Sequence, residues 1–180
     1  MNNKISENEI WITKVDKKYI KLFDSFSTLE QDLIDFLKED SIYNQEIKLS
    51  ITYLFLDDKK QNILGYVSIL SDSIKINADL GKIFVDKGIN YKSLPAIKIG
   101  RLCVNSNFER RGIGTLLIDF VHRICINLSM NYLGCRLISL DSKRESIKFY
   151  EKVGFKILRG ENKLQVPMYL DIEKYKVREK

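Results

Sequence analysis

Apolar residues concentrate in five short segments whose composition is typical of β-strands. The first two flank the polar turn DDKKQN (57–62), and together they predict a β-hairpin. The third contains Gly100, which indicates a bulge or a close backbone approach. The predicted strands are SITYLFL (50–56), ILGYVSIL (63–70), AIKIGRLCV (96–104), CRLISL (135–140) and KLQVPMYLDI (163–172).

Apolar residues at helical spacing lie before and between these strands. Ser27 and Glu30 in STLE fit a capping box, and the apolar pattern after them predicts the start of a helix. Asp141 and Ser142 are suitable caps for another helix in DSKRESIKFYEKVGF, and Gly154 is placed as its C-terminal stop. The predicted helices lie at about 28–39, at about 40–48, from Gly112 to about Met130, and in the segment that ends at Val153.

The predicted order is helices, a hairpin and then β-α-β-α-β. This order indicates an α+β or α/β fold with a mixed sheet. The length of 180 residues suits one domain, spanning 1–180. No apolar run approaches the ~18 residues of a membrane span, and the start lacks the apolar block of a signal peptide. We therefore expect no membrane contact and a cytoplasmic location.

Charge and cysteine content narrow the candidate chemistry only a little. The net charge of +6 favours anionic partners such as nucleotides, RNA or acidic surfaces. The three cysteines are widely spaced, so we expect buried thiols rather than disulfides, and no His/Cys cluster predicts a metal site. The only histidine, His122, lies in the middle of the third predicted helix and is expected to be structural or on the surface.

The segment FERRGIGTL (108–116) connects a predicted strand to a predicted helix. A helix start offers unpaired N–H groups, Gly112 and Gly114 remove Cβ atoms that would hold an anion away, and Arg110 and Arg111 can reach the same anion. The dinucleotide fingerprint fails because Leu117 occupies its third glycine position, and no G-K-[ST] follows for a P-loop. The alternative is a tight strand-to-helix turn with exposed arginines.

Four motifs in a fixed order resemble one family. IGRLCV, RRGIGTLLIDF, CRLISLDS and FYEKVGF together resemble the GNAT superfamily of acyl-CoA N-acetyltransferases over about residues 50–172. The resemblance implies a mixed, mostly antiparallel sheet that splays between its two central strands and is flanked by helices. It also implies acetyl-CoA as cofactor and an acyltransferase that moves acyl groups other than aminoacyl groups.

The resemblance implies roles for particular residues. The strand 99–104 would pair with the pantetheine arm, the amides of 110–115 would hold the pyrophosphate, and Tyr150 would be the general acid for the departing sulfur. Glu109 occupies a position where the family usually has Gln or Arg, so we assign its side chain no role. The implied cofactor-binding residues are Leu102, Cys103, Val104, Arg110, Arg111, Gly112, Ile113, Gly114, Thr115 and Lys143.

The chemistry of acetyl transfer needs a neutral amine. Tyr150, with a reference pKa of about 10, keeps its proton at neutral pH, and a strand N–H at Cys103 or Val104 could polarise the thioester carbonyl. Asp72, Asp79 and Asp141 are candidates for a base by location alone. A site without a strong base suits an α-amine better than a lysine amine, because the α-amine is already partly neutral.

The N-terminal half resembles one branch of the family. FDSFSTLEQDLIDFLKEDSIYNQ, TYLFLDD, GYVSILSDSI and PAIKIGRLCV are similar to the GNAT toxins of bacterial toxin–antitoxin pairs, although Ser25 and Phe26 replace the usual Cys-Gly. The resemblance implies the α-amine of aminoacyl-tRNA as acceptor and leaves an antitoxin protein and a homodimer open as partners. A small-molecule, peptide or protein amine is the alternative acceptor, and a non-catalytic module that binds CoA or RNA is the third reading.

Overall fold

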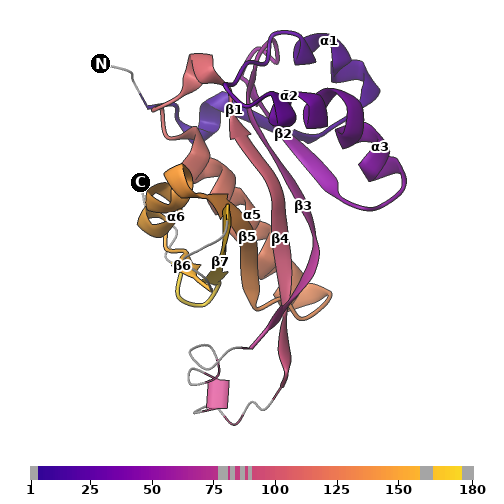
Figure 1. Ribbon diagram of the computed structural model, residues 1–180. Coiled ribbons are helices and arrows are strands. Elements are labelled where there is room, and N and C mark those ends of the chain that lie inside the picture. The colour runs from indigo at the N-terminus through magenta and orange to yellow at the C-terminus, as the bar shows by residue number, and fades with distance from the viewer. Residues whose placement is uncertain are drawn as a thin grey trace. The chain divides into compact units, whose positions relative to one another are not determined.

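A seven-stranded sheet runs through the computed structural model, which describes residues 4–76, 81, 84–85, 88, 91–158 and 164–175 (Figure 1). The strand order is β1-β2-β3-β4-β5-β7-β6, and β4 and β5 are neighbours joined through a helix, the connection typical of a parallel pair. The β1–β2, β2–β3, β5–β7 and β6–β7 pairs are antiparallel. The strands are β1 (Ile10–Lys14), β2 (Ile51–Asp57), β3 (Ile63–Lys75), β4 (Ser93–Val104), β5 (Leu137–Lys143), β6 (Lys156–Ile157) and β7 (Gln165–Asp171).

Helices flank the sheet, as the predicted mixed α+β fold requires. The two helices predicted at 28–39 and 40–48 are one continuous helical stretch, in which a π-helical segment, η3, separates two α-helical parts. The α-helices are α1 (Ile20–Phe23), α2 (Gln31–Asp35), α3 (Ser41–Glu46), α5 (Ile113–Asn131) and α6 (Ile147–Lys152), η3 is Phe36–Asp40, and the 3-10 turns are η1 (Glu7–Glu9), η2 (Lys17–Tyr19), η4 (Ser106–Phe108) and η5 (Arg144–Ser146).

Two predicted helix caps are wrong. Glu30, not Ser27, is the N-cap of α2, and the Ser27 hydroxyl instead donates a hydrogen bond to Asn105 Oδ1 at 3.3 Å. Asp141 and Ser142 lie inside β5, where they pair with β7, and α6 begins only after η5. In both cases a partner distant in sequence takes the group that local spacing assigned to a cap.

The chain groups into two compact units. The first comprises Met1–Leu70 and Ile99–Phe120, and the second comprises Ser71–Lys98 and Val121–Lys180. The strands β3 and β4 and the helix α5 each contribute to both units. The single domain that the length predicts stays a prediction.

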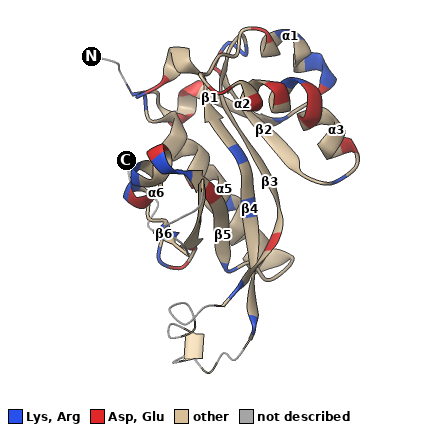
Figure 2. Ribbon diagram, in the orientation of Figure 1, with Lys and Arg blue, Asp and Glu red and all other residues tan. Residues whose placement is uncertain are grey.

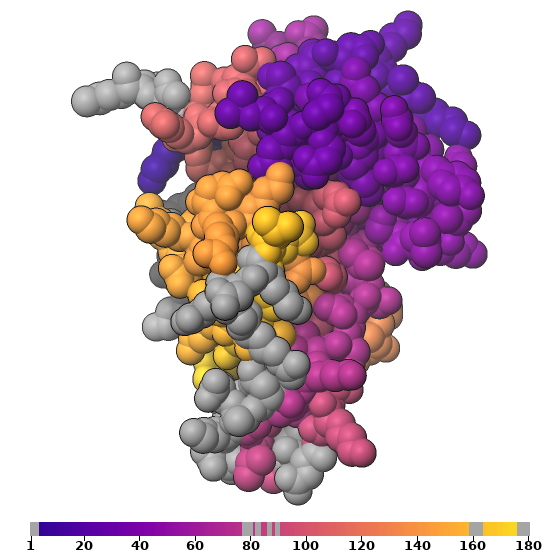
Figure 3. Space-filling model, in the orientation of Figure 1, coloured from indigo at the N-terminus to yellow at the C-terminus, as the bar shows by residue number. Residues whose placement is uncertain are grey.

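The core of the first unit lies between the sheet and the N-terminal helices. Tyr66 is fully buried, and its hydroxyl donates to the carbonyl of Leu33 at 2.8 Å. Phe26 and Phe36 pack on the Tyr66 ring at centroid distances of 5.5 and 6.1 Å. In the space-filling view the side chains of α1, α2 and α3 form one continuous surface (Figure 3). The buried residues of this cluster are Val15, Phe23, Phe26, Phe36, Leu37, Leu54, Leu56, Ile63, Tyr66 and Cys103.

The core of the second unit is organised around Arg136. Its guanidinium forms ion pairs with Asp171, at 3.0 Å, and with Glu173, and it lies 5.3 Å from the ring centre of Phe84. Burial alone would lower the pKa of Arg136, but the two acidic partners raise it. The buried apolar residues beside this group are Ile74, Phe84, Leu94, Ala96, Leu137 and Tyr169.

Helix α5 corrects our expectation about apolar runs. Its 19 residues, with a mean hydropathy of 1.3, are long and apolar enough to cross a membrane by length and composition alone. A core helix of a soluble protein passes the same test, and Ile113, Leu117 and Cys125 on this helix are at most 1% exposed. A single helix of this kind is weak evidence for a membrane span.

The cysteines and the histidine are structural, as predicted. Cys103, Cys125 and Cys135 are all free and buried. His122 is 6% exposed, its Nε2 lies 2.9 Å from the carbonyl oxygen of Ile172, and its ring packs on Tyr175. A ring nitrogen this close to a carbonyl oxygen is the protonated one, so His122 is a core donor rather than an exposed base.

Candidate active site

The turn between β4 and α5 has an unusual backbone. Arg110 has φ +60° and Gly112 has φ +87°, so two residues in three are left-handed. A non-glycine residue in this region is strained by about 1 kcal/mol or more, and such strain collects at functional sites. Turns that mix right- and left-handed residues make concavities of N–H groups that bind anions. The backbone therefore has the form that the sequence predicted for an anion site.

The hydrogen bonds of this turn show which backbone N–H groups are left available for a ligand. The carbonyl of Gly112 accepts from the amides of Thr115, at 3.1 Å, and Leu116, at 3.2 Å. Within the described part of the chain, no acceptor is recorded for the amides of Gly112, Ile113 and Gly114. A Cβ added to Gly112 would have no atom within 4 Å, so the space beside these amides is open. The Ile113 side chain is 1% exposed, which leaves only its backbone for a ligand.

The two arginines of the turn differ. Arg110 is exposed, whereas the Arg111 guanidinium packs over Phe108, 5.4 Å from the ring centre. The buried Nε of Arg111 has no hydrogen-bond partner, and its carbonyl accepts from the Ile5 amide at 3.2 Å. An unpaired buried donor is costly, so this Nε is an unexplained feature of the turn. Glu109 is exposed, which agrees with giving it no role.

The end of β4 presents backbone rather than reactive side chains. Cys103 points into the core and is 5% exposed, while Leu102 and Val104, on the other face of the strand, are half-buried. Burial raises the pKa of the Cys103 thiol to about 11, so this thiol is protonated at neutral pH and is a poor nucleophile. A Cβ on Gly65 would lie 2.8 Å from the Cys103 carbonyl oxygen, so β3 and β4 approach closely here.

Tyr150 lies in α6, in the second unit. Its ring packs edge-on against Phe149, at 5.0 Å, and Phe155, at 5.6 Å, and the residue is half-buried. The helix ends in a Schellman motif: the Phe155 amide donates to the Tyr150 carbonyl at 2.9 Å, and the Gly154 amide donates to the Glu151 carbonyl at 3.0 Å. The left-handed Gly154, with φ +98°, confirms the predicted stop and fixes the backbone of Tyr150.

Lys143 is the last residue of β5, where it pairs with Gln165. It is half-buried and stands directly before η5. Lys143 therefore occupies a strand end that leads into the helix with Tyr150. Its contact with a cofactor phosphate stays a prediction.

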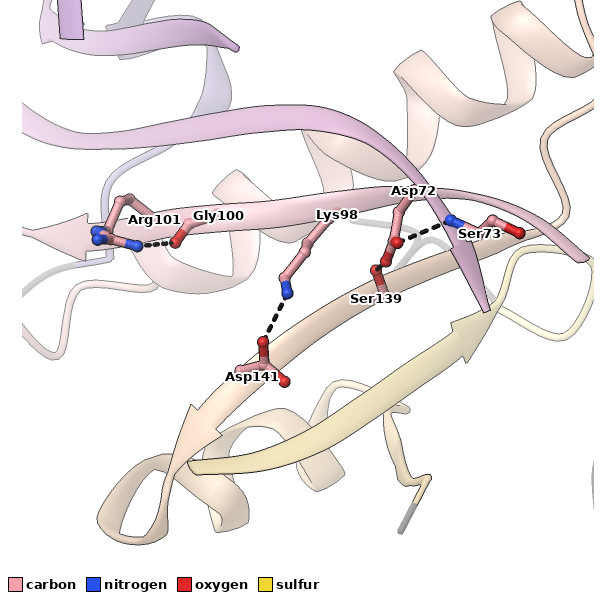
Figure 4. Close-up of polar contacts among 7 residues, drawn as sticks. All are labelled: Asp72, Ser73, Lys98, Gly100, Arg101, Ser139 and Asp141. Carbon is pink, nitrogen blue, oxygen red and sulfur yellow. Dashed lines mark hydrogen bonds and ion pairs between the residues drawn. The ribbon is translucent and has the colours of Figure 1, made fainter. Parts of the chain in front are cut away.

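The acidic residues considered as bases already have partners (Figure 4). The Asp141 carboxylate on β5 forms an ion pair with Lys98 on β4, with an Nζ–Oδ2 distance of 2.6 Å. The Asp72 carboxylate accepts hydrogen bonds from the Ser139 hydroxyl and, at 2.7 Å, from the Ser73 amide. Asp79 lies outside the described residues. Asp72 and Asp141 are therefore both engaged by neighbouring groups, and the absence of a strong base stays a prediction.

Charges are unevenly spread over the elements (Figure 2). Acidic side chains gather on α2 and η3, whereas β4 carries Lys98 and Arg101. The Arg101 guanidinium lies 5.3 Å from the ring centre of Phe36 and donates to the Gly100 carbonyl at 2.8 Å. A Cβ at Gly100 would lie 2.9 Å from the Leu70 side chain but 3.8 Å from the nearest backbone atom, the Ser68 carbonyl oxygen, so the close backbone approach predicted there is not seen.

A mixed sheet, with an open strand-to-helix turn of unpaired amides after its central strand, defines the class of acyl-CoA N-acetyltransferase folds. The sequence model of the acetyltransferase (GNAT) domain matches residues 50–157, and the chain belongs to this family. The match covers the hairpin, the turn, α5, β5 and α6.

Solved structures of two toxin enzymes share the fold. A structure of AtaT complexed with acetyl-methionyl-tRNA is 20% identical, with a TM-score of 0.79, and the match covers 91% of this chain and 95% of that one. A tyrosine-to-phenylalanine mutant of KacT is 19% identical, with a TM-score of 0.78, covering 92% and 96%. A tyrosine-to-phenylalanine mutant of AtaT, bound to the C-terminus of the antitoxin AtaR and acetyl-CoA, is 17% identical, with a TM-score of 0.72, covering 92% and 94%.

Sequence reasoning missed two residues of this region. Asn105 is 1% exposed and bonds several segments, and no sequence pattern marks it. Gly65 stands inside the strand ILGYV, and a glycine within a strand could have indicated the close approach that the structure places there.

Proposed function

We propose that this protein is an acetyl-CoA-dependent N-acetyltransferase that moves the acetyl group directly to a primary amine. Family membership supports the reaction class. The observation that carries the proposal is the turn after β4, where strained Arg110, open Gly112 and the unsatisfied Nε of Arg111 all favour an anion. Acetyl-CoA supplies the acetyl group as a thioester and carries the diphosphate that this turn suits.

Each part of the site has a definite task in this proposal. The amides of Gly112, Ile113 and Gly114 and the two arginines bind the diphosphate. The backbone of Leu102, Cys103 and Val104 pairs with the pantetheine arm, and an N–H at Cys103 or Val104 polarises the thioester carbonyl. The Tyr150 hydroxyl holds a proton for the departing sulfur. Thr115 contributes through its side chain, because its amide is used within the chain, and Lys143 adds a cation for the cofactor phosphates.

For the acceptor we propose the α-amine of aminoacyl-tRNA. The likeness to AtaT, which was solved with acetyl-methionyl-tRNA, supports this acceptor, and the net charge of +6 is compatible with RNA. The ion pair with Lys98 engages one candidate base, Asp141, and an amine that is already partly neutral needs a base less than a lysine amine does. A cytoplasmic location, an antitoxin partner and a homodimer belong to the same proposal.

A thiol-release assay over a panel of amines tests the function. We expect turnover with an aminoacyl-tRNA, and we expect Tyr150→Phe to bind acetyl-CoA normally while losing most of the rate, on the order of 10²-fold. Phe149→Leu is the matched control, because it alters the aromatic packing and keeps the phenol. An unchanged rate in Tyr150→Phe would remove Tyr150 from the mechanism.

The anion site has its own test. Arg110→Ala combined with Arg111→Ala should weaken acetyl-CoA binding, and the loss should be larger at low salt because screening is weaker there. Lys59→Ala, on the β2–β3 turn, removes a positive charge elsewhere in the first unit and should leave the affinity unchanged. Turnover on small amines with no transfer to tRNA would select the alternative acceptor, and acetyl-CoA binding without thiol release would select the non-catalytic reading.

A further inference from the structure

The side chain of Asn105 joins three segments of the first unit. It follows β4 directly and is 1% exposed. Its Nδ2 donates to the carbonyl of Ile63, at the start of β3, at 2.9 Å, and its backbone amide donates to the carbonyl of Leu64 at 3.0 Å. The position of the amide side chain is thereby fixed to the sheet.

The Oδ1 atom of Asn105 serves two further segments at once. It accepts from the Asn107 amide at 3.1 Å, which caps η4, and from the Ser27 hydroxyl at 3.3 Å. The Ser106 amide in turn donates to the Ser27 carbonyl at 2.8 Å. The Asn105 side chain and the Ser106 backbone thus both connect the start of the turn 105–112 to the segment 25–30.

The segment 25–30 runs from α1 to α2 and lies against the end of β4. The Thr28 side chain lowers the pKa of the Cys103 thiol, against the larger raising effect of burial, so the two side chains are neighbours. The Asn105 Nδ2 also reaches the Ser25 carbonyl at 3.5 Å. The segment is therefore held beside the strand end to which the proposed function assigns the thioester.

Resting on that proposed function, we propose that Asn105 is a positioning residue that couples acetyl-CoA binding to the acceptor side of the site. An amine that attacks a thioester at Cys103 and Val104 must approach past the groups beside that strand end, and segment 25–30 stands there. When the turn 105–112 is ordered by the diphosphate, the shared Oδ1 carries the ordering to Ser27. Acetyl-CoA binding then prepares the acceptor wall before the amine arrives.

Hydrogen exchange on the full chain, with and without coenzyme A, tests the coupling. In the wild-type protein, coenzyme A should slow amide exchange both in the turn 105–112 and in segment 25–30. Asn105→Ala should keep the slowing in the turn and lose it in the segment. Because Asn105→Ala could fail to fold, Ser27→Ala is the second variant: it removes the bond to Oδ1 and should reduce the slowing in the segment, which the backbone bond from Ser106 partly preserves.

Kinetics give a second readout that a purely structural residue would not move. Ser27→Ala should raise the KM for the amine acceptor about threefold to tenfold, because a change of this size corresponds to the loss of one hydrogen bond. The affinity for coenzyme A should stay unchanged. Asn107→Ala is the control, because Asn107 is exposed and contributes only its backbone amide to Asn105. It should match the wild type in both experiments.

The outcomes separate the two proposals. Failure of the wild-type protein to bind coenzyme A in calorimetry would overturn the proposed function. A different result would overturn only the role of Asn105. In that case Ser27→Ala binds coenzyme A normally, its segment 25–30 is protected as strongly as in the wild type, and its KM for the acceptor is unchanged. The proposed function would then still stand.

Discussion

Gly65 is the glycine at which replacement by alanine should disturb β4, the strand proposed to bind pantetheine, most. It pairs with Phe55 across β2 and β3. A Cβ at this position would stand 2.8 Å from the Cys103 carbonyl oxygen, and 3.3 Å from both Ile113 Cγ2 and Leu117 Cδ1. The first contact is with backbone, so a side-chain rotation cannot relieve it. Gly65→Ala must push β4 or the first turn of α5 away.

The size of the effect follows from two opposing terms. Overpacking a filled site by one methyl group costs about 1–3 kcal/mol, while replacing a strand glycine by alanine regains about 0.5–1 kcal/mol of chain entropy. The expected net loss is roughly 1–2 kcal/mol in the free energy of unfolding. At about 2–4 °C per kcal/mol for a chain of this size, the melting temperature should fall by roughly 2–8 °C.

Thermal and urea unfolding, together with coenzyme A titration, measure this prediction. Coenzyme A affinity should fall as well, because the displaced carbonyl belongs to the strand proposed to bind pantetheine. Gly134→Ala is the control: its new Cβ would lie 3.8 Å from Pro95 Cγ, an ordinary contact, so stability should be unchanged or slightly higher. If Gly65→Ala were as stable as Gly134→Ala, the close approach of β3 and β4 would not be a rigid constraint.

Two further predictions concern the helix with Tyr150 and the acid limit of stability. Gly154→Ala forces alanine to φ +98° and should lower the free energy of unfolding by about 1–2 kcal/mol. The variant should also have a lower kcat, because the Schellman motif fixes the Tyr150 backbone. Glu151→Ala keeps the motif and should retain the wild-type kcat. Burial raises the pKa of Asp57, but hydrogen bonds such as those from Asn62 outweigh burial, so the pKa is lower in the folded protein than in the unfolded chain. The ionised Asp57 therefore stabilises the folded state fully above its unfolded pKa of about 3.9, and this stabilisation is lost as pH falls through the lower folded pKa. Asp57→Asn should flatten this acid limb in urea unfolding between about pH 2 and 6, and an unaltered limb would show that other carboxylates carry it.

The sequence predicted the strands better than the helix starts, for a physical reason. The buried positions of β2 and β3 are occupied mainly by apolar residues, many of them β-branched or aromatic, so the composition of these segments indicates strands directly. A helix start depends on which acceptor a short polar side chain reaches first. Ser27 reaches Asn105, 78 residues away, instead of its own helix, and local spacing contains no trace of that choice.

The candidate site could be predicted only where backbone chemistry determines it. Glycines before an apolar helix indicate an anion-binding turn, and Gly112 has the positive φ and the open space that this requires. The strand β1 was missed because IWITK is short and mixes half-buried with exposed positions, such as Trp11 and Lys14, without a regular alternation. The unpaired Nε of Arg111 and the junction at Asn105 depend on contacts between distant segments, which a single sequence does not encode locally.

The strain in the turn after β4 is balanced by contacts from outside it. The left-handed Arg110 costs about 1 kcal/mol, and the space beside the Cα of Gly112 is open. The turn is instead fixed at one end by the Oδ1 of Asn105 and at the other by the Ile5 amide on the Arg111 carbonyl. A turn held at its two ends needs less ordering when an anion binds, and the ordering that remains is what the proposed coupling passes to Ser27. In the proposed function, residues far from the turn in sequence therefore contribute to diphosphate affinity alongside the two arginines.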